Sequence, residues 1–306
     1  MRAVITREFG GPEVLEIAEV PVPEPAEGQV LVKVGAATVN PVDLATRSGA
    51  LAALLGEVDQ VGLGWDVAGT VHAAGPGAGF AVGDTVIGLR DRPATPLGAQ
   101  ADHVLLDASA VAATTLPTVA AATLPLNGLT AVQALDLFEF EPGSTLLVTG
   151  AAGAVGGFAV ELAARRAIRV VAQAGPRDEE FVRGLGAEWF VPRGGDLAEA
   201  VRALVPGGVD GVLDTAVLGA PALGAVRSGG VLVAVRIGAE PLAERGIRVA
   251  TVRVHADGPR LAELSALAER GELTLRVAHT LPLHEVRHAH ELLAKGGLRG
   301  RVVLVP

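Results

Sequence analysis

The residues best placed to do chemistry lie in the stretch from Ser144 to Ala164, STLLVTGAAGAVGGFAVELAA. Here an apolar strand enters a glycine-rich turn and leaves it directly as a helix, which is the context that a dinucleotide fingerprint requires. Gly153 and Gly156 are three residues apart, so the backbone could approach a pyrophosphate at the first and the helix could pack on the strand at the second. Ala151 stands where the first glycine of the fingerprint would be.

A pyrophosphate would lie on backbone N–H groups at the start of this helix, where the partial positive charge favours an anion. We therefore predict that the whole turn binds a dinucleotide cofactor. The alternative is a glycine-rich turn without a ligand, because a chain with 40 glycines produces such spacings by chance. The predicted cofactor contacts are Gly150, Ala151, Ala152, Gly153, Ala154, Val155 and Gly156.

The residues after the turn indicate which dinucleotide it would take. An NAD site places an acidic residue about 20 residues downstream on the ribose 2′-hydroxyl, whereas an NADP site offers groups that accept a phosphate. No carboxylate occurs from Leu162 to Pro176, and Arg177 follows directly. Its guanidinium could bind a 2′-phosphate through charge-assisted hydrogen bonds, and Arg193 is a second candidate. Either arginine could also be an ordinary solvated loop residue, but the pattern favours NADPH.

The apolar runs that must position these residues fall into two parts. From Val4 to about Leu106, short apolar runs alternate with Gly, Pro and Asp turns, which is typical of an all-β unit. From Thr145 onward, strands alternate with helices over 155–166 and 178–185. This alternation predicts a parallel sheet with crossover helices.

The C-terminal segment departs from that alternation. It contains an amphipathic helix around Leu264, a helix over 283–295 and a closing strand, RVVLV. The segment could therefore return to the first part and leave the cofactor domain inserted in the middle. A length of 306 residues suits two domains.

Composition excludes several other functions. The chain has no cysteine, so disulfides, a thiol nucleophile and thiolate-bound zinc are ruled out. A net charge of −9 argues against nucleic acid as a partner. The longest uncharged stretch, Ala108 to Leu135, is interrupted by Pro117 and Pro125, which argues against a membrane span. The N-terminus lacks a secretory apolar region, so we expect a cytoplasmic protein.

Motifs along nearly the whole chain resemble the medium-chain dehydrogenase/reductase superfamily, in its zinc-independent quinone oxidoreductase and zeta-crystallin branch. They include VNPVDLATRSG, GWDVAGTVHAAGPGAGFAVGDTVIGL, LPLNGLTAVQAL, TGAAGAVGG and PLHEVRHAHELLAKGGLRGRVVL. The resemblance implies an α/β protein in which a doubly wound Rossmann domain is inserted into a GroES-like β-barrel domain. The implied domains are 1–118 with 256–306 for the GroES-like catalytic part and 119–255 for the NADP-binding part.

The resemblance also implies catalytic residues. Asn40 and Trp65 stand where zinc-dependent relatives have their first two metal ligands, so we expect zinc-independent chemistry with no bound metal. Asn40 and Asp43 of the NPVD motif are implied to lie near the nicotinamide and the reacting atoms, and Thr130 to approach the nicotinamide. The alternatives are a simple turn at Asn40 and a helix N-cap at Asp43. No tyrosine is present, and Ala45 and Arg193 replace the two tyrosines usual in this branch, which weakens inference about the substrate.

The expected reaction is hydride transfer from NADPH to a quinone or an α,β-unsaturated carbonyl. An enoyl-thioester or polyketide-associated enoyl reductase, and a catalytically silent NADPH sensor, remain as alternatives. Family analogy suggests a homodimer that pairs strands near 249–254. The tail places His284 and His288 one helical turn apart, a spacing that could bind a metal, although exposed histidines on a surface helix are the simpler explanation.

Overall fold

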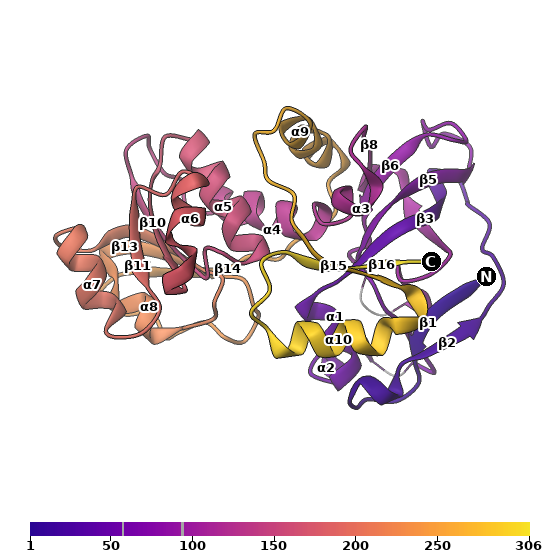
Figure 1. The fold of residues 1–306 in the computed structure, drawn as a ribbon, viewed down its shortest axis with the longest axis horizontal. Helices are drawn as coiled ribbons and strands as arrows, with labels where there is room; N and C mark the ends of the chain where they lie inside the picture. Colours follow the sequence, from indigo (N-terminus) through magenta and orange to yellow (C-terminus); the bar gives the residue numbers. More distant parts are fainter. Residues whose placement is uncertain (57, 93–94) are drawn as a thin grey trace. The chain divides into compact units, whose positions relative to one another are not determined.

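The computed structural model describes residues 1–56, 58–92 and 95–306, and within them the chain forms two compact units. The first unit contains Met1–Leu129 and His255–Pro306, and the second contains Thr130–Val254. Both chain ends therefore belong to the first unit, and the second is inserted between them (Figure 1). The division between catalytic and cofactor domains at 118/119 and 255/256 stays a prediction about function.

The described residues of the first unit form two sheets. The larger has the strand order β15-β16-β3-β5-β6-β8, with β7 also paired to β3, and the smaller has the order β2-β1-β4. The C-terminal strand β16 pairs with β3 in antiparallel register, with Val302 opposite Val39, which confirms that the last segment returns to the first unit. The strands are β1 Arg2–Thr6, β2 Glu16–Glu19, β3 Gln29–Val39, β4 Val61–Gly62, β5 Asp66–Ala74, β6 Thr85–Leu89, β7 His103–Asp107, β8 Val111–Ala113, β15 Val277–Pro282 and β16 Arg301–Val305.

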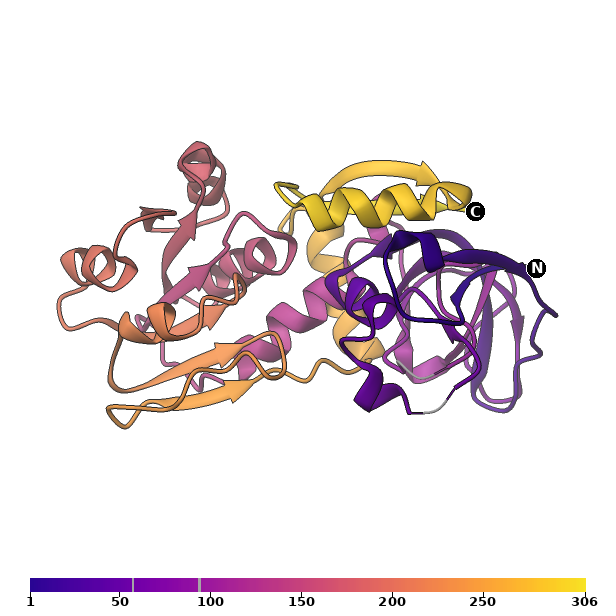
Figure 2. The same cartoon turned by 90° about the horizontal axis from the view of Figure 1, so that it is seen from below.

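The helices of the first unit lie against these sheets. The last helix, α10, packs along β15 and β16 (Figure 2) because Val286 and Ala289 repeat at helical spacing and are buried. The helices are α1 Pro41–Ser48, α2 Ala52–Leu55, α3 Thr118–Ala121, α9 Gly258–Glu269 and α10 Val286–Lys295, with 3₁₀ turns η1 Pro12–Val14, η2 Ala108–Ala110 and η4 Leu283–Glu285. Helix α4, Pro125–Asp136, begins in the first unit and continues into the second.

The second unit is a doubly wound parallel sheet. Its strand order, β11-β10-β9-β12-β13-β14, reverses direction beside β9, and every neighbouring pair is parallel. Ligands bind at this kind of switch point in open α/β sheets. The elements are β9 Thr145–Thr149, α5 Ala154–Arg165, β10 Arg169–Ala174, η3 Pro176–Asp178, α6 Glu179–Gly184, β11 Trp189–Pro192, α7 Leu197–Leu204, β12 Val209–Asp214, α8 Ala220–Gly224, β13 Val226–Ala234 and β14 Arg248–Thr251.

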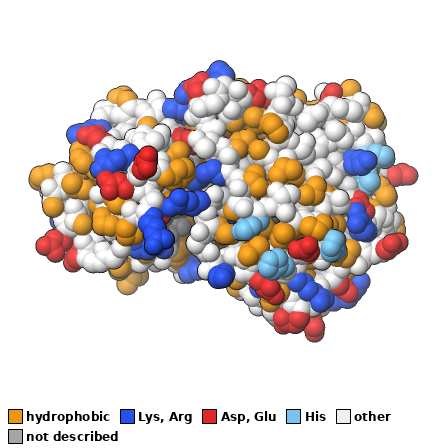
Figure 3. Space-filling view, in the orientation of Figure 1, with side chains coloured by type: hydrophobic (Ala, Val, Ile, Leu, Met, Phe, Trp, Pro, Cys, Tyr) orange, Lys and Arg blue, Asp and Glu red, His pale blue; other side chains and the backbone are white. Residues whose placement is uncertain are grey.

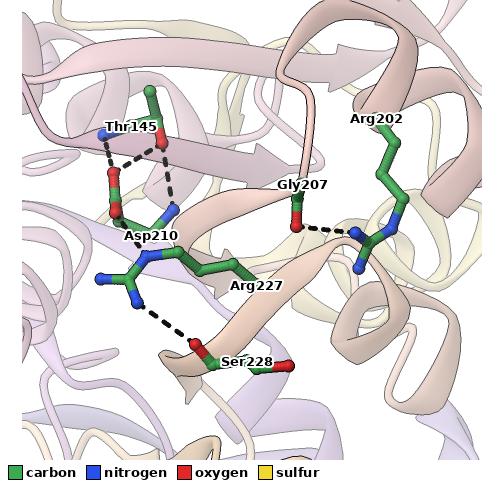
Figure 4. A network of polar contacts seen from close by, with 6 residues as sticks. All are labelled: Thr145, Arg202, Gly207, Asp210, Arg227 and Ser228. Carbon is green, nitrogen blue, oxygen red and sulfur yellow. Dashed lines mark hydrogen bonds and ion pairs between the residues drawn. The ribbon is translucent and has the colours of Figure 1, made fainter.

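A polar network ties the starts of the central strands together (Figure 4). Asp210 of β12 accepts hydrogen bonds from the backbone N–H and the hydroxyl of Thr145 in β9, both at 2.7 Å. Arg227 of β13 donates to the same carboxylate at 2.7 Å. Because the other end of β9 enters the glycine-rich turn, this network anchors the strand that positions the turn.

In the part of the chain that the structure describes, no helix has both the length and the apolar character needed to cross a membrane.

Candidate active site

The glycine-rich turn has the geometry that the sequence predicts. Gly150 leaves β9 with φ of +60°, a left-handed conformation that favours glycine. The Ala151 N–H donates to the carbonyl of Gln173 at 3.0 Å, and the Gly150 N–H donates to the Gln173 side chain at 3.2 Å. The turn is therefore fastened to the end of β10, the neighbouring strand.

Helix α5 starts immediately after Gly153 and packs tightly on the turn. A Cβ atom at Gly156 would lie 2.3 Å from the Gly150 carbonyl oxygen and 2.9 Å from Ala151 Cα, so no larger residue fits. At Gly153 a Cβ atom would meet only the Gly150 oxygen, at 3.0 Å. The backbone at Gly153 thus has space beside it at the helix N-terminus. A close backbone approach at this point fits the pyrophosphate of a dinucleotide.

The segments that carry the two predicted phosphate-binding arginines both adjoin the end of β10. Arg177 lies in η3, two residues after Gly175, and a Cβ atom at Gly175 would lie 3.1 Å from Nη2 of Arg193. The backbone N–H of Arg193 donates to the Ala174 carbonyl at 2.7 Å, so the segment that carries Arg193 is bound to the end of β10. Gln173 occupies the strand end where an NAD site would have a carboxylate. The Asp178 carboxylate lies there as well, since a Cβ atom at Gly175 would be 2.7 Å from its Oδ2.

In the first unit, Asn40 and Asp43 meet at the start of α1. Asn40 is the N-cap, and its backbone N–H donates to the Asp43 carboxylate at 2.8 Å. The other Asp43 oxygen accepts the Gly64 N–H at 2.9 Å. Asp43 is therefore the N3 residue of a capping box and also holds the segment before β5. The alternative that Asp43 is the N-cap is wrong, because Asn40 occupies that position.

The Asn40 side chain is fully buried, and each of its polar groups has a protein partner. Its Nδ2 donates to Thr38 Oγ1 at 2.8 Å and to Asp66 Oδ2 at 2.6 Å, while its Oδ1 accepts from Asn127 at 3.3 Å. Arg301 donates to Asn127 Oδ1 through Nε at 3.1 Å and through Nη2. Because a guanidinium can only donate, this contact fixes which way the Asn127 amide points, and Asn127 then orients Asn40.

Buried charges surround this network. Burial raises the pKa of Asp43 to about 7 and also raises the pKa of Asp66, against the opposing effect of their hydrogen bonds. Burial lowers the pKa of Arg301 to about 10, and the nearby Asp66 charge opposes that change. Arg301 therefore stays protonated at neutral pH and compensates the carboxylate of Asp66.

Sequence reasoning missed Asp66, Asn127 and Arg301. The available signal was weak: Arg301 is a charge at the start of an apolar strand, and Asn127 is a polar residue in an apolar helix. The third predicted catalytic residue, Thr130, lies three residues after Asn127 in α4 and is nearly buried. It belongs to the second unit, whereas Asn40 and Asp43 belong to the first.

The histidines of the tail differ from one another in the structure. His284 and His288 are exposed, and histidine side chains are visible on the face that carries α10 (Figure 3). His290, two residues after His288, is fully buried, so the simple explanation of exposed histidines on a surface helix does not extend to it. It lies on the face of α10 that packs inward with Val286 and Ala289. No cluster that could hold a metal ion occurs among the described residues.

His290 is expected to make folding stability depend on acid pH. Burial, reinforced by the positive charge of Arg47, lowers its pKa from 6.5 to about 3. Below pH 6.5 the unfolded chain binds a proton that the folded chain does not, so stability is full above that pH and falls as the pH drops. Because of His290, the unfolding free energy of the parent protein should fall by about 1.4 kcal/mol for each pH unit below 6.5. His290→Gln should not show this part of the fall. The difference in unfolding free energy between the two proteins at each pH measures it.

The exposed His288 supplies the control for this measurement. His288→Gln should leave the unfolding free energy at pH 7 near that of the parent protein, because the side chain is exposed. Asp43→Asn should change the profile in the opposite direction, since a carboxyl with a raised pKa stabilises the fold as the pH falls from about 7 toward 3.8. Parallel profiles for His290→Gln and the parent protein would contradict the assignment.

Two family profiles match the chain. Residues 26–116 match the alcohol dehydrogenase GroES-like domain, and residues 185–304 match a family described as zinc-binding dehydrogenase. These matches fall on the β-rich first unit and on the later part of the doubly wound sheet with the C-terminal segment. Together with the turn, they define an oxidoreductase with a GroES-like unit and an inserted Rossmann-type unit.

Individual relatives agree with this class. The NADPH-dependent alkenal/one oxidoreductase of Arabidopsis thaliana is 30% identical over all of this chain and 80% of its own length. A quinone-oxidoreductase homolog from Spinacia oleracea is 36% identical over 61% of this chain, which spans 60% of that protein. A Streptomyces orinoci spectinabilin polyketide synthase system protein is 34% identical over 96% of this chain, which covers 14% of it.

Solved structures show the same fold along the whole chain. The quinone oxidoreductase from Coxiella burnetii superposes with a TM-score of 0.88 at 30% identity, covering 100% of this chain and 99% of its own. A mycobacterial protein solved with NADPH gives a TM-score of 0.85 at 28% identity, covering 100% of both chains. The chain therefore belongs to the medium-chain dehydrogenase/reductase superfamily, in its quinone oxidoreductase branch.

The residues of this chain do not fit a catalytic zinc. Cysteine is absent, Trp65 stands at the second implied ligand position, and the Asn40 amide is committed to Thr38, Asp66 and Asn127. A tetrahedral zinc site needs nitrogen, sulfur or carboxylate ligands that can face the metal together. The side chains at these positions therefore cannot form such a site.

Proposed function

We propose that this protein is a zinc-independent, NADPH-dependent oxidoreductase that transfers hydride to a quinone or an α,β-unsaturated carbonyl. The observation that carries the proposal is the cofactor turn. Gly153 has space beside its backbone for a pyrophosphate, and Gly156 lets α5 pack on the turn. Arg177 and Arg193 lie in segments that adjoin the end of β10, where the Asp178 carboxylate also lies. The named activities of the Arabidopsis and Coxiella relatives support the same reaction class.

The protein contributes position and charge to this reaction. Bound NADPH supplies the hydride from C4 of its nicotinamide. The backbone from Gly150 to Gly156 would hold the pyrophosphate, and Thr130 would hold the nicotinamide. Asn40 and Asp43 would form the wall beside the reacting atoms, with Asn40 held rigid by its buried partners. Such rigid placement is worth several orders of magnitude in rate when the reacting atoms are aligned.

The test is consumption of NADPH with a panel of quinones, enones and enoyl thioesters, with NADH run in parallel. Saturable turnover with NADPH and a quinone or enone is the expected result. Tight NADPH binding without turnover of any acceptor would favour a silent sensor. Equal use of NADH would contradict the roles given to Arg177 and Arg193.

Those two arginines can be tested directly. The double variant Arg177→Met/Arg193→Met should weaken NADPH binding by about tenfold to hundredfold for each lost charge-assisted contact and leave NADH binding nearly unchanged. Titration of the protein with each nucleotide measures both dissociation constants. NADPH binding should be the more affected because NADPH carries the 2′-phosphate and NADH does not.

Arg183 is the matched control. It is an exposed arginine on α6 whose guanidinium is paired with Glu179 at 2.9 Å. Arg183→Met should change neither dissociation constant. If the double variant weakened NADH as strongly as NADPH, the arginines would act on the fold or the pyrophosphate instead of the 2′-phosphate.

Reduction of an enoyl thioester is a second candidate. The match over 96% of this chain to a polyketide synthase system protein favours it. An enoyl thioester presents the same conjugated carbonyl, so the cofactor turn serves both reactions equally well. A higher kcat/KM with an enoyl thioester than with its matching simple enone would select this candidate.

A homodimer and a cytoplasmic location remain predictions. Strand β14 forms one edge of the sheet in the second unit, and its backbone could pair with a second copy there. The predicted pairing segment, 249–254, begins within this strand.

A further inference from the structure

The carboxyl end of β12 carries a buried acid that the proposed reaction has not yet used. Asp214 is the last residue of this strand and is only 1% exposed. One of its carboxylate oxygens accepts the Thr149 hydroxyl at 2.6 Å and the Leu218 N–H at 3.1 Å, and the other accepts the Gly219 N–H at 2.8 Å. Asp214 therefore joins the end of β9 to the loop that follows β12, residues 215–219.

Thr149 makes the same connection from the side of β9. It is fully buried, its hydroxyl accepts the Ala216 N–H at 3.0 Å, and its carbonyl accepts the Thr215 hydroxyl. The loop also packs on the first residue of the cofactor turn, since a Cβ atom at Gly150 would lie 3.0 Å from Thr215 Oγ1 and 3.3 Å from Ala216 Cβ. The loop and the turn are therefore neighbours at the carboxyl end of this sheet.

Val217, in the middle of this loop, has a strained backbone. Its φ is +58°, in the left-handed region that is unfavourable for an L-residue and most of all for a β-branched one. Such strain persists only where the surrounding structure enforces it, and it is concentrated at sites that bind ligands or do chemistry. The enforcing contacts come from the residues on both sides, because the Ala216 N–H bonds to Thr149 and the Leu218 N–H bonds to Asp214.

The strand order places this loop beside the second half of a bound dinucleotide. A dinucleotide binds across the switch point of a doubly wound sheet, with one mononucleotide half on each side. The arginines proposed for the adenosine 2′-phosphate follow β10 and β11, which lie on one side of β9. Strand β12 lies on the other side of β9. The nicotinamide half would therefore lie against the loop 215–219.

We infer that Asp214 and Thr149 are positioning residues that hold the loop 215–219 in its strained shape as a wall for the nicotinamide half of NADPH. This inference rests on the proposed function and extends its account of the cofactor site. Both side chains are buried, so they act through the backbone of the loop and not by touching the cofactor. Loss of either one should let Val217 relax and change the surface that the nicotinamide half meets.

The experiment compares two ligands that differ by the nicotinamide half, NADPH and adenosine 2′,5′-bisphosphate. Thr149→Val removes the hydroxyl that bonds to Asp214 and to the Ala216 N–H. For these two lost hydrogen bonds we expect the dissociation constant of NADPH to rise about tenfold to hundredfold, and that of the bisphosphate less than about threefold. Thr149→Ser keeps the hydroxyl and should bind both ligands like the parent protein.

A second pair of substitutions tests the strain itself. Asp214→Asn places amide N–H groups where the carboxylate accepts backbone N–H groups, so it should weaken NADPH binding in the same selective way. Glycine adopts a positive φ without strain. Adding Val217→Gly to Asp214→Asn should therefore restore NADPH affinity by at least about threefold. If Asp214 acted through its charge instead, Val217→Gly would restore nothing, and the inference would fail.

The fluorescence of bound NADPH separates positioning from general destabilisation. The dihydronicotinamide ring is the fluorophore, so emission at saturating protein reports how firmly that half is held, and it should be lower with Thr149→Val than with the parent protein. Arg202→Met is the control within the same unit. Arg202 donates to the carbonyls of Gly207 at 2.7 Å (Figure 4) and Gly224 at 2.9 Å, just before β12 and β13. Its loss should lower the melting temperature and leave nucleotide binding and emission near those of the parent protein.

Failure of the proposed function gives a different result from failure of this inference. If the parent protein binds NADPH but reduces no quinone or enone, the proposed reaction fails, and the two titrations still decide the inference. If the parent protein reduces an acceptor while Thr149→Val weakens both ligands equally or neither, only the inference is overturned. Absence of NADPH binding by the parent protein would overturn both. If Thr149→Val does not fold, Asp214→Asn carries the same comparison.

Discussion

Gly156→Ala is expected to weaken NADPH binding at least about hundredfold, because it forces the backbone of the cofactor turn to move. The added Cβ would lie 2.3 Å from the Gly150 oxygen and 2.9 Å from Ala151 Cα, and both are main-chain atoms that cannot rotate away. The N–H groups that would cradle the pyrophosphate are in the same backbone. Loss of two such charge-assisted hydrogen bonds accounts for the magnitude. Overpacking should also lower the unfolding free energy by about 1–3 kcal/mol.

Two other glycine variants separate binding from folding. Gly153→Ala places its Cβ where only the Gly150 oxygen lies, at 3.0 Å, so it should weaken NADPH binding with a smaller effect on stability. Gly184→Ala, at the end of α6, meets nothing within 4 Å and should change neither. Titration with NADPH and chemical denaturation of all three variants measure the two effects. Tight NADPH binding by Gly156→Ala would show that the turn is not the pyrophosphate site.

Asn40→Ala is expected to lower kcat about hundredfold while the dissociation constant for NADPH changes less than about threefold. Asn40 joins Thr38, Asp66 and Asn127 in one buried network, and its loss removes the contacts that hold this wall of the site in place. Small displacements of groups beside the reacting atoms lower the rate of hydride transfer more than they weaken cofactor binding, because the cofactor is held by the turn. Single-turnover kinetics with NADPH and a quinone or enone measure the step directly.

Thr114→Val controls for general destabilisation. Thr114 is also buried in the first unit, where its hydroxyl bonds to Ser265 at 2.8 Å, but it takes no part in the Asn40 network. Its substitution should cost stability comparably and leave kcat near that of the parent protein. An unchanged turnover number for Asn40→Ala would remove Asn40 from the mechanism.

Local sequence was sufficient for the elements whose pattern is self-contained. The helix predicted over 155–166 is α5, Ala154–Arg165, and the helix predicted over 178–185 corresponds to η3 and α6, which ends at Gly184. In these stretches the spacing of apolar residues, the glycines and the polar ends all favour the same structure. The predicted helix boundaries therefore differ from the observed ones by only a residue or two. The strand-turn-helix context of the cofactor turn is likewise contained in about twenty adjacent residues.

The polar network around Asn40 could not be predicted in this way. Its members come from β3, β5, α4 and β16, and the separation between Asn127 and Arg301 is 174 residues. No spacing rule connects residues that far apart, because their contact depends on strand pairing and helix packing in the finished fold. The same holds for His290, whose burial depends on the face that α10 turns to the sheet.

By itself, the sequence determined the class of this protein: a β-rich unit, an inserted parallel α/β unit, a dinucleotide turn with arginines in place of an acid, and no cysteine for a catalytic zinc. These features are local or compositional, so the order of residues is enough to show them. Only the tertiary structure decided that the Asn40 amide is fully occupied and that Arg301 orients its partner Asn127. Both facts depend on which distant groups burial brings within hydrogen-bonding distance, and that is a property of the packed chain.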